Sequence, residues 1–378
     1  MTTLTEKKAK LQEAFPELSA FELAKLVLEQ KDGRTATVSE ILVPVRARFM
    51  AKELRRPRAK IQPDGTMKVR DTSTYRTYET YWIRFEEEHG ALPISELTDE
   101  MVIDFCVAAQ EHAKANHAIS DAKREAVGRT VRERDGASSY NHALEAVAAV
   151  VRYAIRKGFI TVDPLDEVER LPISESDRYG LTPEQVDAIM YAALNGGNDP
   201  VLDYILLWSM LETACRIGGL LKLRIGDIDA KHQFIRLHEK GGKSRKQPVT
   251  RALADALLQI AKERGSVNAN DPVFRYHPNA AGRGAPMKAK RFETLWKRIA
   301  KELKWVDDEG ISSHWMRHST LTWVDRVASP TVASKYAGHG PNNVTGTYTK
   351  ARLNEITKAH EALFGQFHPA QDWSRKNA

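Results

Sequence analysis

Hydrophobic residues recur at helical spacing along most of the chain, and this pattern predicts a mainly α-helical protein. The repeat is clearest in residues 138–159, and it also appears in residues 72–85 and 97–109, where Thr98 stands at a capping position. The apolar face of the first of these segments carries Leu144, Val147, Val151 and Ile155, and Gly158 ends it. These segments together predict a small helical bundle of roughly 100 residues.

The period changes in one later region, which predicts a small antiparallel β-sheet. Residues 232–238 and 246–250 alternate or run apolar over strand lengths, and the Gly/Lys-rich residues 239–245 separate them. This arrangement is typical of a hairpin with a basic tip. Helical patterns resume at residue 291, so the second half is predicted to be mainly α with one small sheet.

A polar segment, residues 171–180, separates the two halves. It precedes a helix start in which Thr182 is the cap, Pro183 lies in the first turn and Gln185 stands at the capping-box position. We therefore place a domain boundary in this segment. The predicted division is a helical and basic N-terminal region (1–62), a helical domain (63–172), a second domain (173–367) and a C-terminal tail (368–378).

Composition and charge favour a soluble protein with a polyanionic partner. The chain has 57 Lys and Arg residues against 50 Asp and Glu, a formal net charge of +7. Cys106 and Cys215 are far apart in sequence, which argues against a disulfide or a cysteine-based zinc site and suits a reducing cytosol. The N-terminal residues are interrupted by lysines and match neither a signal peptide nor a membrane span. We expect a cytoplasmic protein.

Two stretches are more basic than a solvated surface requires. Residues 46–60 contain Arg46, Arg48, Lys52, Arg55, Arg56, Arg58 and Lys60. Residues 122–139, between two predicted helices, contain Lys123, Arg124, Arg129, Arg132 and Arg134. Each stretch either contacts a DNA backbone, where neutralised phosphates release counterions, or is a solvated basic segment.

Arg216 is unusual because of the residues before it. Residues 206–215 have the composition of a buried helix, and a guanidinium removed from water is costly unless an anion or several acceptors meet it. Arg216 is therefore either exposed or bound to something negative.

A second group of polar residues lies in two later segments. His314 and Arg317 are three positions apart, which places them on one face if residues 311–324 are helical. His339 and Tyr348 follow in residues 335–350.

Metal binding is the competing interpretation of these histidines. His314 and His318 have the i, i+4 spacing of a zinc helix, but the zinc-protease motif needs a glutamate where this chain has Trp315. We therefore predict no metal site.

The order and spacing of five short motifs identify a resemblance. They are R-I-x-x-L-L-x-L ending in D-I-D (216–229), K-G-G-K-S-R (240–245), H-x-x-R-H-S (314–319), G-H (338–339) and Y-T-K (348–350). From about Thr72 to Phe367 the chain resembles the tyrosine recombinase, or phage integrase, family of site-specific DNA recombinases. The resemblance implies a helical core-binding domain followed by an α+β catalytic domain.

The resemblance also implies roles for six residues. Tyr348 would be the nucleophile, Lys240 the general acid, and Arg216, His314, Arg317 and His339 would surround the scissile phosphate. Elementary chemistry agrees, because a phenol with a pKa of about 10 needs activation and guanidiniums offer paired donors to a phosphoryl transition state. Such a site requires no metal, ATP or other cofactor.

The implied partner is double-stranded DNA, bound by a tetramer that spans two sites and admits accessory DNA-bending or directionality proteins. The side chains expected to contact DNA are Lys123, Arg124, Arg129, Arg132, Arg134, Lys222, Lys243, Arg245, Arg283 and Lys288. The helix predicted at 352–367 would dock on a neighbouring protomer or fold back within its own chain through Leu353, Ile356 and Leu363.

The expected function is conservative strand exchange through a 3′-phosphotyrosyl intermediate, in the integration and excision of a phage or mobile element. The alternatives are a non-catalytic DNA-binding relative, or the same chemistry in dimer or telomere resolution. One departure stands out, because the family commonly has an acid where this chain has Gly219. Asp227 would replace that acid only if the fold brings it near.

Overall fold

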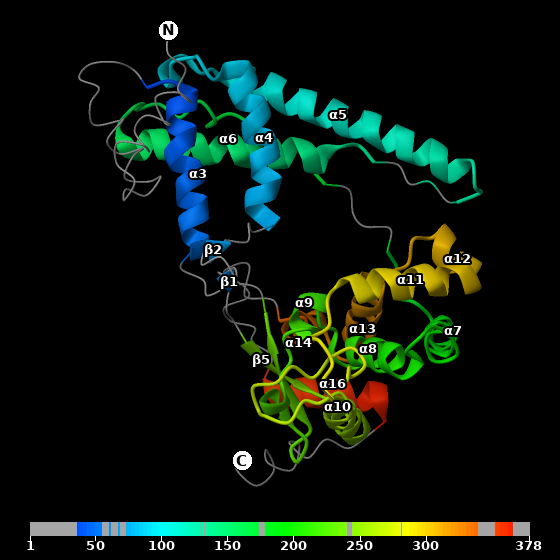
Figure 1. Ribbon diagram of the computed structural model, residues 1–378. Coiled ribbons are helices and arrows are strands. Elements are labelled where there is room, and N and C mark those ends of the chain that lie inside the picture. Colours follow the sequence, from blue (N-terminus) through cyan, green and yellow to red (C-terminus); the bar gives the residue numbers. More distant parts are fainter. Residues whose placement is uncertain are drawn as a thin grey trace. The chain divides into compact units, whose positions relative to one another are not determined.

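The computed structural model describes residues 36–54, 60–61, 67–68, 73–129, 131, 134–173, 178–239, 244–280, 282–338 and 352–365. These residues form two compact units, which divide near residue 175, with residues 128–130 assigned to the second unit (Figure 1). None of the helices in these ranges is long and apolar enough to span a membrane.

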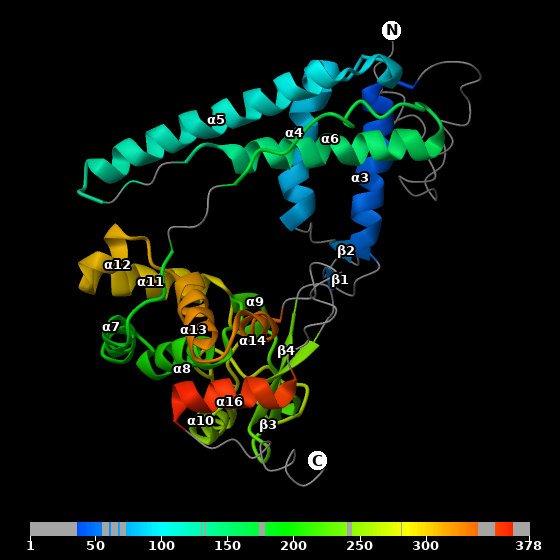
Figure 2. The same cartoon turned by 180° about the vertical axis from the view of Figure 1, so that it is seen from behind.

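In its described residues, the first unit is a bundle of four helices with one short hairpin. Figures 1 and 2 both show α5 and α6 lying side by side, with α3 and α4 running across α6. Its elements are α3 (Val38–Leu54), β1 (Lys60–Ile61), β2 (Met67–Lys68), α4 (Ser73–His89), the 3₁₀ turn η1 (Ile94–Glu96), α5 (Asp99–Glu125) and α6 (Ala137–Lys157).

Aromatic and aliphatic side chains fill the core of this bundle, as the helical repeat predicts. Trp82 is fully buried and its Nε1 donates to the carbonyl oxygen of Ala146 at 2.8 Å, which ties α4 to α6. The predicted ends are also confirmed. Thr98 caps α5 by accepting from the backbone N of Met101, and Gly158 ends α6 in the left-handed conformation that glycine tolerates.

The helix α3 belongs to this bundle, which differs from the expected division after residue 62. Ile41, Leu42 and Val45 lie in the same buried cluster as the aromatic residues of α4. Arg46, which the sequence offered as a DNA contact, pairs instead with Glu86 at 2.6 Å and with Glu79 at 3.4 Å. The other expected boundary, after residue 172, is close to the observed one.

The second unit is mainly helical with one three-stranded antiparallel sheet in the order β3-β4-β5, which confirms the predicted fold class. The elements before and within the sheet are α7 (Pro183–Leu194), α8 (Pro200–Thr213), α9 (Ile217–Leu220), the 3₁₀ turn η2 (Ile225–Asp227), β3 (Ile228–Asp229), β4 (Phe234–His238) and β5 (Ser244–Pro248). The elements after it are α10 (Arg251–Glu263), α11 (Lys290–Glu302), α12 (Lys304–Asp308), α13 (Ser313–Val327), α14 (Pro330–Tyr336) and α16 (Leu353–Phe364).

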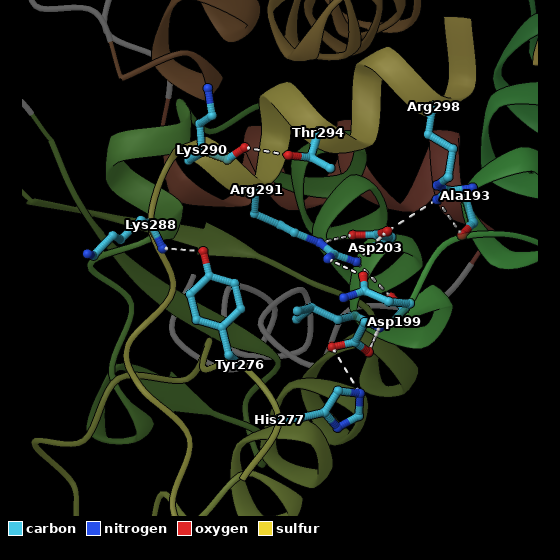
Figure 3. Close-up of polar contacts among 12 residues, drawn as sticks. Ala193, Asp199, Asp203, Tyr276, His277, Lys288, Lys290, Arg291, Thr294 and Arg298 are labelled. Atoms are coloured by element: carbon cyan, nitrogen blue, oxygen red, sulfur yellow. Dashed lines mark hydrogen bonds and ion pairs between the residues drawn. The ribbon is translucent and has the colours of Figure 1, made fainter. Parts of the chain in front are cut away.

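The helix α8 is the centre of this unit. It packs against α7, α10 and α13, and Leu206, Leu207 and Met210 are buried in its core. Its first turn carries the acids of a buried ion-pair network that holds α11 (Figure 3). Asp203, which is 1% exposed, accepts two bonds of 2.7 Å from Arg291 and one of 3.1 Å from Arg298. Because these side chains are removed from water, the loss of one partner would leave a buried charge without its counter-ion.

The last described helix, α16, packs within its own chain, which is the second of the two arrangements expected for it. It lies against α13 and α14, and Ile356 is buried there beside Tyr336. Leu363 is partly buried and Leu353 is exposed, so two of the three predicted apolar contacts are used.

Candidate active site

Arg216 stands where the chain leaves the core, not inside a helix. The helix α8 ends at Thr213, Ala214 takes a left-handed conformation with φ of 47°, and Arg216 is the extended N-cap residue of α9. The side chain of Arg216 is 47% exposed. The apolar helix predicted over residues 206–215 ends at Thr213, and Arg216 lies outside it, exposed and paired with the Glu239 carboxylate, so both of the alternatives expected for Arg216 are observed.

Arg317 reaches the same turn from α13, whose helical conformation was predicted. It is 3% exposed, and its guanidinium donates to the carbonyl oxygens of Ala214 and, at 2.8 Å, of Ala337. Burial, and then the charges of Arg216 and Arg245, lower the pKa of Arg317 to about 10. At neutral pH it therefore remains a buried cation fixed beside Arg216.

A carboxylate and a third arginine complete the cluster. Glu239 follows β4 directly, and its oxygens accept from Arg216 at 3.2 Å and from Arg245 at 2.9 Å. Arg245, on β5, is 11% exposed and also donates to the carbonyl oxygens of Thr213 at 3.1 Å and Tyr336 at 2.6 Å. We expected Arg245 to contact DNA, but its guanidinium is bound within the protein.

The cluster has an excess of positive charge. The guanidiniums of Arg216, Arg245 and Arg317 surround the carboxylate of Glu239. These four side chains carry three positive charges and one negative charge, a net charge of +2. An excess of two cations with one arginine half-exposed is suited to an incoming anion such as a phosphodiester.

His314 lies one helical turn before Arg317 and is exposed at the surface. Its partial burial, and then the charges of Arg178, Arg317, His318 and Arg216, lower the pKa of its imidazole. His314 is therefore neutral at pH 7 and able to accept a proton. His318, the other histidine considered for zinc, places Nδ1 3.4 Å from the hydroxyl of Thr322.

Eight of the residues singled out from the sequence lie outside the described ranges: Arg55, Arg56, Arg58, Arg132, Lys240, Lys243, His339 and Tyr348. Two of them are next to the cluster along the chain. Lys240 follows Glu239, and Gly338 precedes His339. Gly338 has φ of +72°, and a Cβ there would lie 2.7 Å from Cδ of Arg245, so only glycine fits this approach.

For the remaining basic side chains, contact with DNA is still a prediction. Lys123 is exposed and Arg124 half-buried in the last turn of α5, Arg129 follows that helix, and Arg134 pairs with Asp121 at 2.6 Å. In the second unit, Lys222 approaches the carbonyl oxygen of His238 at 3.5 Å, and Arg283 pairs with Asp271. Figure 3 shows the Lys288 side chain pointing away from the ion-pair network of Asp203, and this lysine is exposed.

Sequence reasoning missed Glu239. Asp227 was to replace the acid only if the fold brought it near Arg216, and its carboxylate instead accepts from the backbone N of Arg224 and faces His238 Nε2 at 2.9 Å. One signal was available, because Glu239 is the only acid in residues 239–245 and directly precedes Lys240.

A helical unit followed by an α+β unit with arginines gathered at a small hairpin agrees with the resemblance to site-specific DNA recombinases that the sequence motifs indicate. The comparisons agree with it, since residues 180–355 match the model of the Phage integrase family. Residues 180–355 are therefore a domain of this family, and the chain is similar to tyrosine-type site-specific recombinases.

Among known sequences, the chain is similar to the tyrosine recombinase XerD of Halalkalibacterium halodurans. The two are 26% identical over 242 residues, which cover 61% of this chain and 76% of the relative. It is similarly related to the tyrosine recombinase XerC of Roseiflexus castenholzii, with 26% identity over 65% of this chain and 77% of that protein.

Solved structures share the fold. The Tn1549 transposon integrase (residues 82–397, Y379F) in complex with transposon right end DNA covers 88% of this chain and 100% of its own, with a TM-score of 0.54 and 17% identity. A lambda integrase tetramer bound to a Holliday junction covers 92% of this chain and 85% of its own, with a TM-score of 0.54 and 13% identity.

Proposed function

We propose that this protein cuts and rejoins duplex DNA through Tyr348. The observation that supports the proposal best is the meeting of Arg216 and Arg317 at the Ala214 turn, one half-exposed and one buried. Two guanidiniums held in this way offer fixed donors to the non-bridging oxygens of a phosphodiester, and they stabilise the charge of its pentacoordinate transition state.

In the proposed reaction, the hydroxyl oxygen of Tyr348 attacks the scissile phosphorus and forms a 3′-phosphotyrosyl bond. His314, neutral because of its lowered pKa, takes the phenolic proton. The P–O5′ bond breaks, and Lys240 protonates the leaving 5′ oxygen. His339 donates a hydrogen bond to the phosphate.

Strand exchange is the reverse step with a different strand. A 5′ hydroxyl of the partner DNA attacks the phosphotyrosyl bond, the phosphodiester reforms and Tyr348 regains its proton. One phosphodiester replaces another, so the sequence of steps is nearly isoenergetic and consumes no nucleotide. We propose that four protomers hold two DNA sites, as in the lambda integrase tetramer bound to a Holliday junction.

The biological role that we propose is the integration and excision of a phage or other mobile element. By fold, integrases from a transposon and from lambda cover 88% and 92% of this chain and the XerH site-specific recombinase covers 86%, so the fold is compatible with this role and also with a Xer-type role. Sequencing the DNA that flanks the gene tests this role. Attachment-like repeats beside mobile-element genes would support it, whereas a lone chromosomal site without such genes would favour chromosome dimer resolution.

Covalent capture tests the chemistry. The protein is incubated with a nicked duplex of its cognate site, so that the cleaved fragment diffuses away and the intermediate accumulates. We expect an adduct that resists denaturation and that Tyr348→Phe abolishes. Binding of the same duplex without any adduct would instead identify a DNA-binding relative that has lost the chemistry.

A further inference from the structure

Glu239 bridges two arginines, of which one is held by several other hydrogen bonds and the other is half-exposed. Its side chain is 9% exposed, Oε1 accepts from Arg245 Nε at 2.9 Å, and Oε2 lies 3.2 Å from Arg216 Nη1. The Arg245 side chain is 11% exposed and is further bound by two backbone carbonyl oxygens and the side chain of Gln247. One oxygen of Glu239 is therefore anchored to a rigid group, while the other holds the half-exposed Arg216.

The carboxylate is charged in this position. Burial alone would raise the pKa of Glu239, but the hydrogen bond from Arg245 and the charges of Arg245, Arg216 and Arg317 outweigh it, so the pKa is lowered. A buried anion of this kind directs a guanidinium by both charge and geometry.

Gly219 lies beside the backbone that leads to Glu239. It is buried, and a Cβ there would lie 3.6 Å from the carbonyl oxygen of His238, the residue before Glu239. That distance is ordinary van der Waals contact, and Gly219 has no left-handed φ, so the fold admits a side chain at this position. A carboxylate at 219 and one at 239 would thus approach Arg216 from neighbouring backbone positions.

Glu239 also lies where the hairpin begins. The pairing of β4 with β5 ends at His238 and Ser244, so the Glu239–Arg245 ion pair closes the base of the loop that carries Lys240. Gly338, the residue before His339, packs on the same pair, because a Cβ there would lie 3.4 Å from Glu239 Oε1. The Glu239 carboxylate is therefore close to the points where the segments carrying two proposed catalytic residues, Lys240 and His339, leave the described structure.

We infer that Glu239 is a positioning residue, which orients Arg216 toward the scissile phosphate in place of an acid at position 219. The inference rests on the proposed function, in which Arg216 binds that phosphate. Glu239 itself contacts neither DNA nor the reacting atoms in this account, so its removal should slow cleavage and leave DNA affinity nearly unchanged.

The test compares Glu239→Gln with the wild-type protein in single-turnover cleavage of a nicked cognate duplex, below the melting temperature of both. We expect cleavage to slow by about 10- to 100-fold, as for a misplaced catalytic group, with an unchanged dissociation constant for the duplex. The matched control is Asp227→Asn, which neutralises a nearby acid bound to His238, and we expect it to cleave at the wild-type rate.

Two double variants test the inference most strictly, because they place an acid at position 219 in a protein that lacks the Glu239 carboxylate. Gly219→Asp and Gly219→Glu are each combined with Glu239→Gln, and we expect at least one double variant to recover most of the lost rate. A purely structural role for Glu239 predicts lost stability without such recovery of the rate.

Three results would overturn the inference: an unchanged rate in Glu239→Gln, an equal loss of rate in Asp227→Asn, or no recovery in either double variant. The failure of the proposed function is a separate result, because the wild-type protein would then form no Tyr348-dependent adduct.

Discussion

At the residue scale, the central feature is a turn at which two arginines meet from different helices. Ala214 adopts φ of 47°, a conformation that is uncommon for a residue with a Cβ, and its carbonyl oxygen accepts from Arg317. After the same turn the chain leaves the core, so the Arg216 side chain is half-exposed. Backbone strain of this kind persists where surrounding contacts hold it, and here the contact is the buried guanidinium of Arg317.

Replacing Arg216 by lysine separates its charge from its geometry. Arg216→Lys keeps the positive charge but loses the planar pair of donors, so we expect the rate of covalent adduct formation to fall about 100-fold. The dissociation constant for the cognate duplex should change little, because one exposed charge remains in place. Equal losses of cleavage and binding, measured on the same duplex, would assign Arg216 a structural role instead.

The lowered pKa of His314 gives a pH test. An unperturbed histidine titrates near pH 6.5, and the lowered pKa moves the protonation of His314 to lower pH, so its imidazole is mostly neutral from pH 8 to pH 7. If His314 takes the proton of Tyr348, the cleavage rate stays level over this range and falls only at lower pH, where His314 becomes protonated. His314→Gln should lower the plateau and remove this acid limb. A wild-type rate that already declines between pH 8 and 7 would contradict the role.

At the element scale, helix ends that are set by a local capping residue could be predicted from the sequence. Helix ends that are set by contacts with residues far along the chain could not. Thr182 with Gln185, Thr98 and Gly158 mark helix ends by their own side chains or lack of one, and all are observed. The end of α8 carries no such signal. An apolar segment runs up to it and Ala214 is a helix former, so a partner 103 residues away in sequence, Arg317, fixes the turn.

Long-range pairing also explains why Glu239 was missed. It is 23 residues from Arg216 in sequence, and no local pattern relates the two. The hairpin was predicted, but its register was not, and the register, which pairs Arg245 with Leu237, brings Arg245 within reach of Glu239 two positions further on.

The buried network of α8 and α11 gives a prediction about stability. Asp203→Asn leaves Arg291 and Arg298 without their carboxylate, so we expect the free energy of unfolding to fall by about 3 kcal/mol. The control is Asp255→Asn, which removes an exposed pair with Arg251 on α10 and should cost less than about 1 kcal/mol. Urea unfolding measures both. Similar small losses in the two variants would mean that water screens the network.

At the scale of the whole molecule, the excess of positive charge should appear in the salt dependence of DNA binding. If Lys123 contacts a phosphate, Lys123→Gln should reduce the slope of log affinity against log salt by about 0.9. Lys114, on the same helix, bonds to Glu111 at 2.8 Å and serves as the matched control, so Lys114→Gln should leave the slope unchanged. Equal slopes for wild type and both variants would show that Lys123 belongs to a solvated face.

The most direct test of the account identifies the atom that joins protein to DNA. Covalent complexes trapped on a nicked cognate duplex are digested with protease and nuclease, and the nucleotide-bearing peptide is sequenced by mass spectrometry. We predict that the nucleotide is attached to Tyr348 through its 3′ phosphate and that the released strand carries a free 5′ hydroxyl. Attachment to another residue, or a 5′-phosphate linkage, would contradict the proposed reaction.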